Sequence, residues 1–371
     1  MSTTTPIKVG FVGLSTTGWA SAVLGPALLQ DSLKNTYDLV AVSTSSEESA
    51  RASAEKYSKE VGHPIEAYFG STEQIAADPN VDLVAISVKA PYHKALVLPV
   101  IQAKKDIFIE WPAGASLEET EEIAEAARVH GVRTIVGLQT RHQAAIQKVR
   151  ELLSSGIIGT VRSTNITNLI PREGHLWIPF SKEKDLYLVE HKNGATQLHI
   201  PILHLLDTVS YLLGDFSSIT ATSTIAYPTG TVVDNDGKPT PRTYAAQNPD
   251  HFSITGILPG GVLANLFWRS GYALGKGRRM YMWEIEGDEG VIRIESSSPF
   301  PSVVEPEVYL NGTQVDLDGP TGAVHTIGAA WKDFAEHGSH HATIEDAVKN
   351  HKLIDAIEKS AREGKTIHLS L

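Results

Sequence analysis

The sequence predicts an α/β protein of two domains. A doubly wound parallel sheet is expected in residues 1–140, and an α+β domain with a large, mostly antiparallel sheet in residues 141–371. The chain has 371 residues, which is long for one domain and suits about two. Its first third alternates short runs rich in Val and Ile with amphipathic segments, and strand patterns then dominate the rest.

Five short apolar runs of the first domain predict buried strands. Helices are expected between them, because parallel strands are joined by right-handed crossovers. One helix begins at a capping box opened by Ser116 and ends at Gly131, and Ser45 with Glu48 marks the start of another. The predicted strands are Ile7–Gly13, Asp38–Ser43, Asp82–Val88, Ile107–Glu110 and Arg133–Leu138.

The pattern changes near residue 140. Helices are expected at Ala144–Ser155, Thr196–Leu213 and residues 344–362, and the last of these closes the chain. The segment Tyr227–Asp250 is rich in Pro, Gly, Asn and Asp, so we expect a mobile loop there. The predicted strands of this domain are Val161–Leu169, Ser218–Ala226, Phe252–Leu258, Val262–Trp268, Met280–Glu286 and Val291–Glu295.

Composition excludes several classes of protein. The formal net charge is −11 and no stretch is dense in Lys or Arg, which argues against direct nucleic-acid binding. There are no cysteines, so disulfides, thiolate nucleophiles and Cys-ligated zinc are ruled out. No apolar run approaches the roughly 20 residues that span a bilayer, and the N-terminus has no signal-peptide pattern. A cytoplasmic protein without membrane contact is expected.

A glycine-bounded turn follows the first predicted strand and precedes a helix. This is the fingerprint of a dinucleotide-binding Rossmann domain, with serine in place of its second glycine. In that motif the pyrophosphate sits at the helix N-terminus, where backbone N–H groups point at it. The alternative is a bare structural turn. The predicted cofactor contacts here are Gly13, Leu14, Ser15, Thr16, Thr17, Gly18 and Trp19.

The second strand ends without the acidic residue that binds the ribose 2′-hydroxyl of NAD. It runs into Ser43, Thr44 and Ser45, and the first carboxylate is Glu47, already in the helix. Hydroxyl groups accept a 2′-phosphate more readily than a carboxylate does, so NADP is favoured over NAD, with Arg51 as a helper. The alternative is that these hydroxyl residues only cap the helix.

Residues 82–141 resemble the glucose-fructose oxidoreductase / inositol dehydrogenase / MocA family. His93 matches the histidine of its TPxxxH-like turn, Glu110 and Pro112 match the ends of its EKP motif, and Arg141 matches its later arginine. The likeness continues through SSGIIGTVRS and the closing ATIEDAVKNHKLIDAIEKSAREGKTIHL. It implies a nicotinamide dinucleotide cofactor contacted by Val88, His93, Glu110 and Arg141, and an oxidoreductase activity.

Two positions depart from the family pattern. Trp111 stands where the EKP lysine would lie beside the nicotinamide and the substrate hydroxyl, and Ile200 replaces the aspartate of the family's D-x-x-x-H-x-x-D helix. His204 and Asp207 of that helix are kept. Trp111 is expected either to stack on the nicotinamide or wall the substrate pocket, or simply to pack as an aromatic side chain.

A subgroup of the family shares these features. Four short segments resemble the fungal galactose-pathway repressor, namely Phe11-Val12-Gly13-Leu14, Gly18-Trp19-Ala20, Glu110-Trp111 and Gly137-Leu138-Gln139. That likeness keeps a second function open, a cofactor-binding transcriptional regulator without catalysis. A third is a redox-neutral, NAD-assisted lyase or glycosidase.

The candidate acid/base of the first hypothesis is His204, because histidine titrates near neutral pH. Tyr187 is expected to assist it as a phenol donor, and Trp111 to line the reacting centre. The alternative for His204 is a core histidine bonded to the backbone. The substrate, a small sugar-, cyclitol- or imine-like molecule, is expected to contact Arg141, His142, Arg172, Trp177, Tyr187 and His199.

Two further expectations concern metal and assembly. His337, His340 and His341 have a tolerable spacing for metal ligands, but Gly338 and Ser339 should end the helix there, so no metal is predicted. A homodimer or larger homo-oligomer is expected through the second-domain sheet, because strands Phe252–Leu258 and Val262–Trp268 are apolar enough to need cover.

Overall fold

The computed structural model describes residues 5–370 and separates into two compact units. The first unit holds the chain up to His142 together with Ala323–Val348, and the second holds Gln143–Gly322 and Lys349–Leu371. A single division after residue 140 therefore misses one segment. Residues 323–348 return to the first unit because the large apolar side chains of this segment, Trp331 and Phe334, are buried in its core.

The first unit is built on a six-stranded parallel sheet in the order β3-β2-β1-β4-β5-β6. The parallel sheet predicted from the alternating pattern is confirmed. The sequence reasoning missed β3, because two of its four residues are exposed, two are half-buried and none is fully buried. The strands are β1 (Ile7–Val12), β2 (Tyr37–Thr44), β3 (Glu66–Phe69), β4 (Leu83–Ile86), β5 (Asp106–Ile109) and β6 (Thr134–Val136).

Helices connect these strands, and their ends follow ordinary capping chemistry. The hydroxyl of Ser116 accepts a hydrogen bond from the Glu119 N–H at 3.3 Å, and Gly131 ends α5 with φ 67°. The cap of α2 is Ser46, one residue beyond the expected Ser45. The helices are α1 (Gly25–Leu28), α2 (Glu47–Val61), α3 (Glu73–Ala77), α4 (His93–Gln102), α5 (Leu117–His130) and α8 (Ala323–Ala335).

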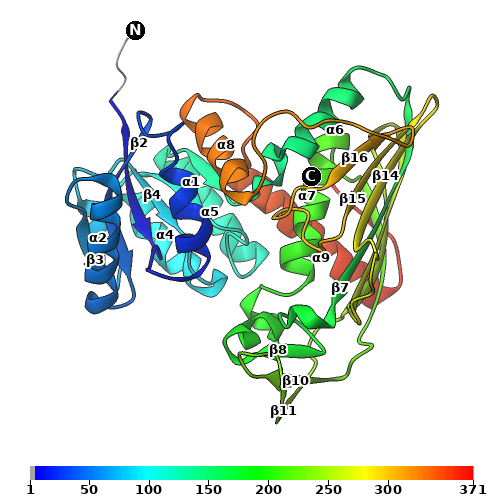
Figure 1. Cartoon of the computed structure of the whole chain (residues 1–371), viewed down its shortest axis with the longest axis horizontal. Helices are drawn as coiled ribbons and strands as arrows, with labels where there is room; N and C mark the ends of the chain where they lie inside the picture. Colours follow the sequence, from blue (N-terminus) through cyan, green and yellow to red (C-terminus); the bar gives the residue numbers. More distant parts are fainter. Residues whose placement is uncertain (1–4, 371) are drawn as a thin grey trace. The chain divides into compact units, whose positions relative to one another are not determined.

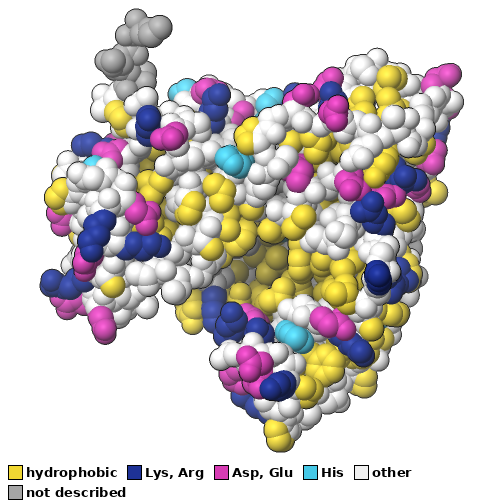
Figure 2. All heavy atoms as spheres, viewed as in Figure 1, with side chains coloured by type: hydrophobic (Ala, Val, Ile, Leu, Met, Phe, Trp, Pro, Cys, Tyr) yellow, Lys and Arg dark blue, Asp and Glu magenta, His cyan; other side chains and the backbone are white. Residues whose placement is uncertain are grey.

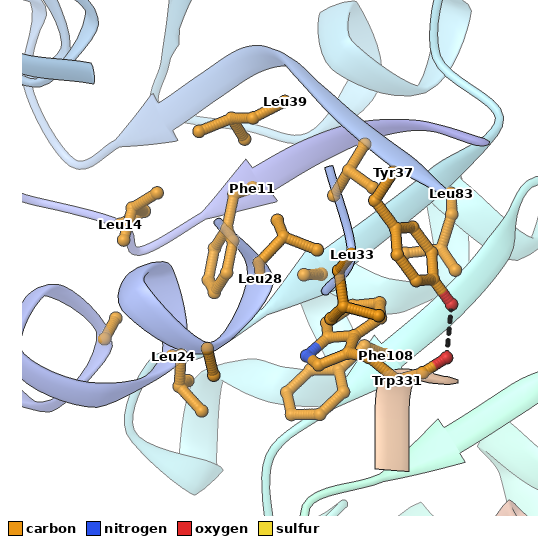
Figure 3. Packing of buried hydrophobic residues seen from close by; sticks show 14 of the residues in the cluster. Phe11, Leu14, Leu24, Leu28, Leu33, Tyr37, Leu39, Leu83, Phe108 and Trp331 are labelled. Carbon is orange, nitrogen blue, oxygen red and sulfur yellow. Dashed lines mark hydrogen bonds between the residues drawn. The ribbon is translucent and has the colours of Figure 1, made fainter. Parts of the chain in front are cut away.

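The core of this unit joins segments that are far apart in the sequence (Figure 3). Trp331 of α8 stacks on Phe108 of β5, with ring centroids 4.9 Å apart. The hydroxyl of Tyr37 donates a hydrogen bond to the Trp331 carbonyl oxygen at 2.7 Å. Truncating a fully buried aromatic side chain such as Trp331 typically costs about 3–5 kcal/mol, so α8 is integral to the Rossmann unit.

The second unit contains a nine-stranded sheet in the order β17-β16-β15-β14-β7-β13-β12-β9-β18 (Figure 1). Its neighbouring strands are antiparallel except for β7 and β13, which are parallel. The strands are β7 (Val161–Pro171), β9 (Ser218–Thr224), β12 (His251–Leu258), β13 (Val262–Tyr272), β14 (Tyr281–Gly287), β15 (Val291–Ser296), β16 (Glu307–Leu310), β17 (Thr313–Gln314) and β18 (Ile367–His368).

One face of this sheet is covered by α6 (Ala144–Ser154), α7 (Leu203–Leu213) and the part of α9 (Ile344–Glu363) that belongs to the second unit (Figure 1). The Asn350 side-chain amide donates to the Asp207 carboxylate at 2.9 Å, which ties α9 to α7. Burial alternates along β13, so that one set of side chains faces these helices and the other faces away.

The predicted mobile loop Tyr227–Asp250 instead holds two strands. β10 (Thr229–Val233) and β11 (Pro239–Ala245) pair with each other, and β10 also pairs with β8 (Phe180–Lys182). The polar residues that suggested mobility form the turn, where Asp234 accepts hydrogen bonds from the Asp236 and Lys238 N–H groups, both at 2.9 Å.

Two surface properties bear on function. On the face drawn in Figure 2, Lys and Arg side chains lie interspersed with Asp and Glu. Among residues 5–370, no helix has both the length and the apolar character needed to cross a bilayer.

Candidate functional site

A pocket of about 560 Å³ lies over the carboxyl ends of the first-unit strands β1, β2 and β4. Ligands of open α/β sheets bind at this edge, and the volume lies in the range of small-molecule sites. Of the predicted cofactor residues, Gly13, Ser15, Ser43, Thr44, Ser45 and Val88 line it. The residues of the lining that the sequence reasoning missed are Val12, Ser49, Gly70, Ser87, Tyr92, Ala95 and Leu96.

The two glycines of the fingerprint meet different needs. Gly13 has φ 88°, and a Cβ there would overlap the Ser87 carbonyl oxygen, so no other residue fits. Gly18 has φ 89°, but open space surrounds the place of its missing Cβ. Gly18, the third position of the fingerprint, is therefore required for its backbone conformation. It does not provide the close helix packing that the motif would suggest.

The serine at the middle position stabilises the turn itself. Its hydroxyl donates to the Thr17 carbonyl oxygen at 2.7 Å and lies 3.4 Å from the Thr17 N–H. Leu14 points away from the pocket and is fully buried in the core. Thr16, Thr17 and Trp19 do not line the pocket and lie exposed on the turn that follows it.

Hydroxyl groups, and no carboxylate, line the end of the pocket at β2 and α2. Ser43, Thr44, Ser45 and Ser49 contribute to this wall. The Thr44 hydroxyl donates to the Ser46 carbonyl oxygen at 3.1 Å. Arg51, the expected helper, forms an exposed ion pair with Glu47 at 2.7 Å on the same helix.

His93 is placed in the interior rather than on the pocket wall. Its Nδ1 lies 2.8 Å from the Pro112 carbonyl oxygen and its Nε2 lies 3.0 Å from that of Val88. Burial lowers the pKa of His93 to about 4, so the ring is neutral at neutral pH. His93 thus links the turns after β4 and β5, and it can influence a cofactor through Val88.

Glu110 follows β5 and makes the most distinctive polar contacts of the first unit. Its Oε1 accepts a hydrogen bond from the Trp19 indole N–H at 3.1 Å, and its Oε2 accepts one from the Trp111 backbone N–H at 3.1 Å. A Cβ at Gly137, the residue after β6, would lie 2.5 Å from Oε2, so a larger residue there would displace the carboxylate or the backbone. Burial raises the pKa of Glu110 to about 7, and both hydrogen bonds oppose that rise.

Arg141 and His142 follow β6 in a network of the first unit. The Arg141 guanidinium forms a largely buried ion pair with Asp346 at 3.3 Å. The Nε2 of His142 is buried without a hydrogen-bond partner among residues 5–370. Burial lowers the pKa of His142 to about 4. The pair is thus more enclosed than substrate-contacting loop residues are expected to be.

The C-terminal histidine cluster is organised by a carboxylate. Asp333 accepts hydrogen bonds from the backbone N–H groups of His340 and His341, at 3.0 and 2.9 Å, and lies 2.7 Å from His341 Nδ1. His337 lies elsewhere, with Nδ1 3.2 Å from an Arg133 nitrogen. Among the residues that the structure describes, no group of three His, Asp or Glu side chains has the geometry of a metal site.

In the second unit, His204 lies in the first turn of α7. Its Nδ1 is buried and has no hydrogen-bond partner within residues 5–370. Burial lowers the pKa of His204 to about 4, while the nearby Asp207 carboxylate acts in the opposite direction. The ring is therefore neutral at neutral pH, which suits a proton acceptor better than a proton donor.

The other predicted residues of this unit lie in several places. Trp177 lines a small pocket together with Gln197 and Tyr244, and its indole nitrogen is buried without a hydrogen-bond partner in the described chain. The Nδ1 of His199 lies 2.8 Å from the Thr196 hydroxyl oxygen, and burial lowers the pKa of His199 to about 3.

Arg172 and Tyr187 complete the set. Arg172 pairs with Glu173 at 3.3 Å. Tyr187 lies in the short helical turn Glu183–Val189, where burial raises the pKa of its hydroxyl. No pocket of the second unit that we describe is lined by His204, Tyr187, His199 or Arg172.

Comparison with known proteins decides the family. Residues 7–138 match the model of the oxidoreductase family with an NAD-binding Rossmann fold, and residues 144–296 match the model of the Gal80p C-terminal domain. Over 96% of its length the chain is 30% identical to Dehydrogenase aclE of Aspergillus oryzae, and the alignment covers 97% of that protein. The chain belongs to the glucose-fructose oxidoreductase / inositol dehydrogenase / MocA family.

The similar proteins include both a regulatory protein and dehydrogenases. The galactose/lactose metabolism regulatory protein GAL80 of Saccharomyces cerevisiae is 27% identical over 84% of this chain and 72% of its own length. The structure of a super-repressor mutant of Gal80p from that yeast has a TM-score of 0.87 at 25% identity, covering 98% of both chains. Levoglucosan dehydrogenase in complex with NADH and L-sorbose has a TM-score of 0.78 at 19% identity, covering 99% of this chain and all of that one, and shows the shared fold.

The residues present fit a nicotinamide dinucleotide. Gly13 leaves backbone exposed where the pyrophosphate would pass, and Ser43, Thr44 and Ser45 offer hydroxyl groups at the ribose end of the pocket. The family's NAD-binding Rossmann fold is thus present in this chain with a pocket of suitable size.

Proposed function

We propose that this chain is an NAD(P)-dependent oxidoreductase acting on a small hydroxylated, carbonyl or imine substrate of sugar or cyclitol type. The observation that carries the proposal is the preserved dinucleotide pocket, in which Gly13 leaves room for the pyrophosphate. Similarity to a dehydrogenase along nearly the whole chain supports it. When bound, the nicotinamide ring supplies or accepts the hydride.

The acid/base role falls to His204 in this proposal. Trp111 cannot titrate and Ile200 offers no polar atom, so neither replaces the lysine or the aspartate of the family pattern. The neutral ring of His204 is proposed to accept the proton of a substrate hydroxyl. Tyr187 is proposed to assist as a hydrogen-bond donor, because its raised pKa keeps the phenol protonated.

Three further parts of the proposal concern the remaining predicted contacts. Glu110 holds the Trp19 turn and the Trp111 backbone where the cofactor's nicotinamide end is expected. NADP is preferred to NAD, since hydroxyl groups line the ribose end. Arg172, Trp177, Tyr187 and His199 are proposed as the substrate contacts, whereas the enclosure of Arg141 and His142 argues against the contact that the sequence suggested for them.

A homodimer is proposed through the outer face of the large sheet. Leu263 and Phe267 on β13 are 53% and 40% exposed, and Leu263 lies directly opposite the exposed Ile257 on β12. Asn265 lies between Leu263 and Phe267 on this face of β13, so the patch mixes exposed apolar side chains with a polar one, and we propose that a second copy covers it.

A cofactor-binding regulator is the second candidate. It is favoured by the match to the Gal80p C-terminal domain and by the two substitutions at Trp111 and Ile200. The two functions separate in one experiment, in which purified protein is incubated with NADP⁺ or NADPH and a panel of sugars, cyclitols, ketones and imines. Absorbance of the reduced nicotinamide reports turnover. Oxidation or reduction with any substrate supports the enzyme, and tight cofactor binding without turnover on the whole panel supports the regulator.

A further inference from the structure

A second pocket, of about 370 Å³, lies wholly within the second unit, and we call it the α9 pocket. It is formed by the last turns of α9, the segment before β12 and the residues that lead into the Leu198 helical turn. The α9 pocket shares no lining residue with the dinucleotide pocket, and His204 does not line it. Its charged side chains, Glu358 and Arg362, have no role in the proposed oxidoreductase chemistry, although the hydroxyl of its Thr196 lies 2.8 Å from His199 Nδ1.

Glu358 of α9 places a half-buried carboxylate in this pocket. Among residues 5–370 it forms no hydrogen bond and no ion pair. Partial burial raises the pKa of Glu358, and the Asp355 carboxylate acts in the same direction, while His191 and Arg362 oppose it. A carboxylate that loses hydration without gaining a partner is destabilised, and a cation would relieve this.

Arg362 places a guanidinium in the same pocket, one helical turn after Glu358. It too forms no hydrogen bond or ion pair with any residue between 5 and 370. The spacing is the i, i+4 spacing with the acid first, which favours direct pairing. The same spacing does close elsewhere, between Glu47 and Arg51 and between Glu55 and Lys59, each at 2.7 Å. Here the two charges stay apart, and both remain available to a ligand.

The rest of the pocket combines hydrogen-bonding groups with an apolar wall. Gln247 accepts from the His191 N–H at 3.4 Å through its carbonyl oxygen, which leaves its amide N–H groups for a ligand. Leu198, Phe252 and Ile357 supply the apolar wall. A ligand that fits must therefore be small, must carry both charges and must have an apolar part.

We propose that the α9 pocket binds a free α-amino acid with an apolar side chain. The ligand's ammonium group pairs with the Glu358 carboxylate, its carboxylate pairs with the Arg362 guanidinium, and its side chain packs on Leu198, Phe252 and Ile357. Glu358 is half-buried and Arg362 is exposed, and hydrogen bonds between ionised groups are stronger and more oriented than those between neutral groups. The site is independent of the proposed oxidoreductase function, because it shares no residue with the dinucleotide pocket.

Matched ligands test this directly by isothermal titration calorimetry on the full chain. L-leucine, L-methionine and L-phenylalanine are compared with 4-methylpentanoate, which lacks the ammonium group of leucine, and with 3-methylbutylamine, which lacks its carboxylate. Saturable binding of at least one amino acid is expected, with the two leucine analogues at least about tenfold weaker than leucine if leucine is the ligand. Absence of binding by all three amino acids, or equal binding of an analogue, would overturn the proposal.

Variants place the ligand in the pocket. Glu358→Gln and Arg362→Gln should each weaken amino-acid binding at least about tenfold, because each removes one of the two charge pairs. Lys359→Gln is the matched control, since Lys359 is exposed on the same helix and does not line the pocket. NADPH affinity, measured in parallel, should be unchanged in all three and serves as a check of folding. Unchanged amino-acid affinity in both pocket variants would assign the binding to another site and refute the proposal.

Discussion

The indole N–H of Trp19 donates a hydrogen bond to the carboxylate of Glu110 at 3.1 Å, although 91 positions separate the two residues in the sequence. The contact joins the turn after β1 to the end of β5, and these two strands flank β4 in the sheet. The Trp111 backbone N–H binds the other carboxylate oxygen. Glu110 is therefore a half-buried acid that is oriented by two donors, and its pKa is raised to about 7.

Replacing Glu110 should change how stability depends on pH. The pKa of Glu110 is about 7 in the folded chain against an ordinary value of 4.5, so the folded state holds the proton more tightly. Its contribution is fully present below pH 4.5 and is lost as pH rises through 7, a change of up to about 3 kcal/mol. Glu110→Gln should therefore flatten the decline in unfolding free energy between these pH values, measured by urea denaturation. Glu118→Gln, on an exposed helix position, is the control, and an unchanged slope in Glu110→Gln would contradict the assignment.

A methyl group at position 137 should be poorly tolerated. In Gly137→Ala the new Cβ would meet Glu110 Oε2 at 2.5 Å, so the carboxylate or the strand must move. We expect a loss of about 1–3 kcal/mol in unfolding free energy, as for other overpacked sites. Gly174→Ala is the matched control, because open space surrounds its missing Cβ and its φ is not positive. Equal stability of the two variants would show that Glu110 can move freely.

Cofactor preference should respond to a carboxylate at the ribose end of the pocket. Ser45→Asp places a negative charge where a 2′-phosphate is expected, so NADPH affinity should fall at least about tenfold while NADH affinity stays within about threefold. Fluorescence titration with both cofactors measures the ratio. Glu60→Gln changes a charge on the exposed surface of α2, outside the pocket, and should leave the ratio alone. A wild-type preference for NADH of more than about tenfold would reject the NADP assignment.

Removal of the candidate base should reduce turnover more than cofactor binding. His204→Ala is expected to lower kcat by about 10²–10⁴, the usual contribution of a positioned acid or base. Because the pKa of His204 is about 4, oxidation of a hydroxyl should stay active as pH falls through 6.5 and should decline only toward pH 4. His368→Gln, an exposed histidine of the same unit, is the control. Near-normal turnover in His204→Ala would move the role elsewhere, and Tyr187→Phe would be the next variant to test.

The outer sheet face should control assembly. Phe267→Glu introduces a charge into the apolar patch, so a dimeric wild type should shift to a monomer of 40.1 kDa in light scattering at micromolar concentration. Phe69→Glu also changes an exposed phenylalanine, but in the first unit, and should leave the mass unchanged. If the wild type is itself monomeric, the homodimer proposal fails.

Local patterns were enough to predict much of the fold. Each of these predictions needed only a few consecutive residues, because short-range sterics and hydrogen bonding are enough to favour a strand, a helix cap or a helix end. They include the apolar runs at β1, β2, β4, β5 and β6, the cap at Ser116 and the helix end at Gly131. The same holds for the glycine turn. A positive φ at Gly13 and at Gly18 depends on the residue type itself, which is why the position of the candidate dinucleotide pocket could be predicted from the sequence.

Other features depend on partners that are distant in the sequence. The turn-rich segment 227–250 forms a hairpin, and its strand β10 pairs with β8. Helix α8 belongs to the first unit because Trp331 packs on Phe108 and accepts a hydrogen bond from Tyr37. No local pattern specifies such partners, since the energy comes from burial and pairing across the chain.

Some features of the candidate site could likewise be predicted from local sequence, and others depend on the tertiary structure. The sequence by itself determined the glycine turn after β1, where a dinucleotide pocket is predicted, and the replacement of the polar groups of the family pattern by Trp111 and Ile200. Only the tertiary structure decided that Tyr92 and Leu96 line the pocket and that His93 is enclosed between two carbonyl oxygens. It also decided that Glu110 titrates near neutral pH. The physical reason is that residue type is local, whereas burial, which sets both pKa and accessibility, depends on every segment that packs around a group.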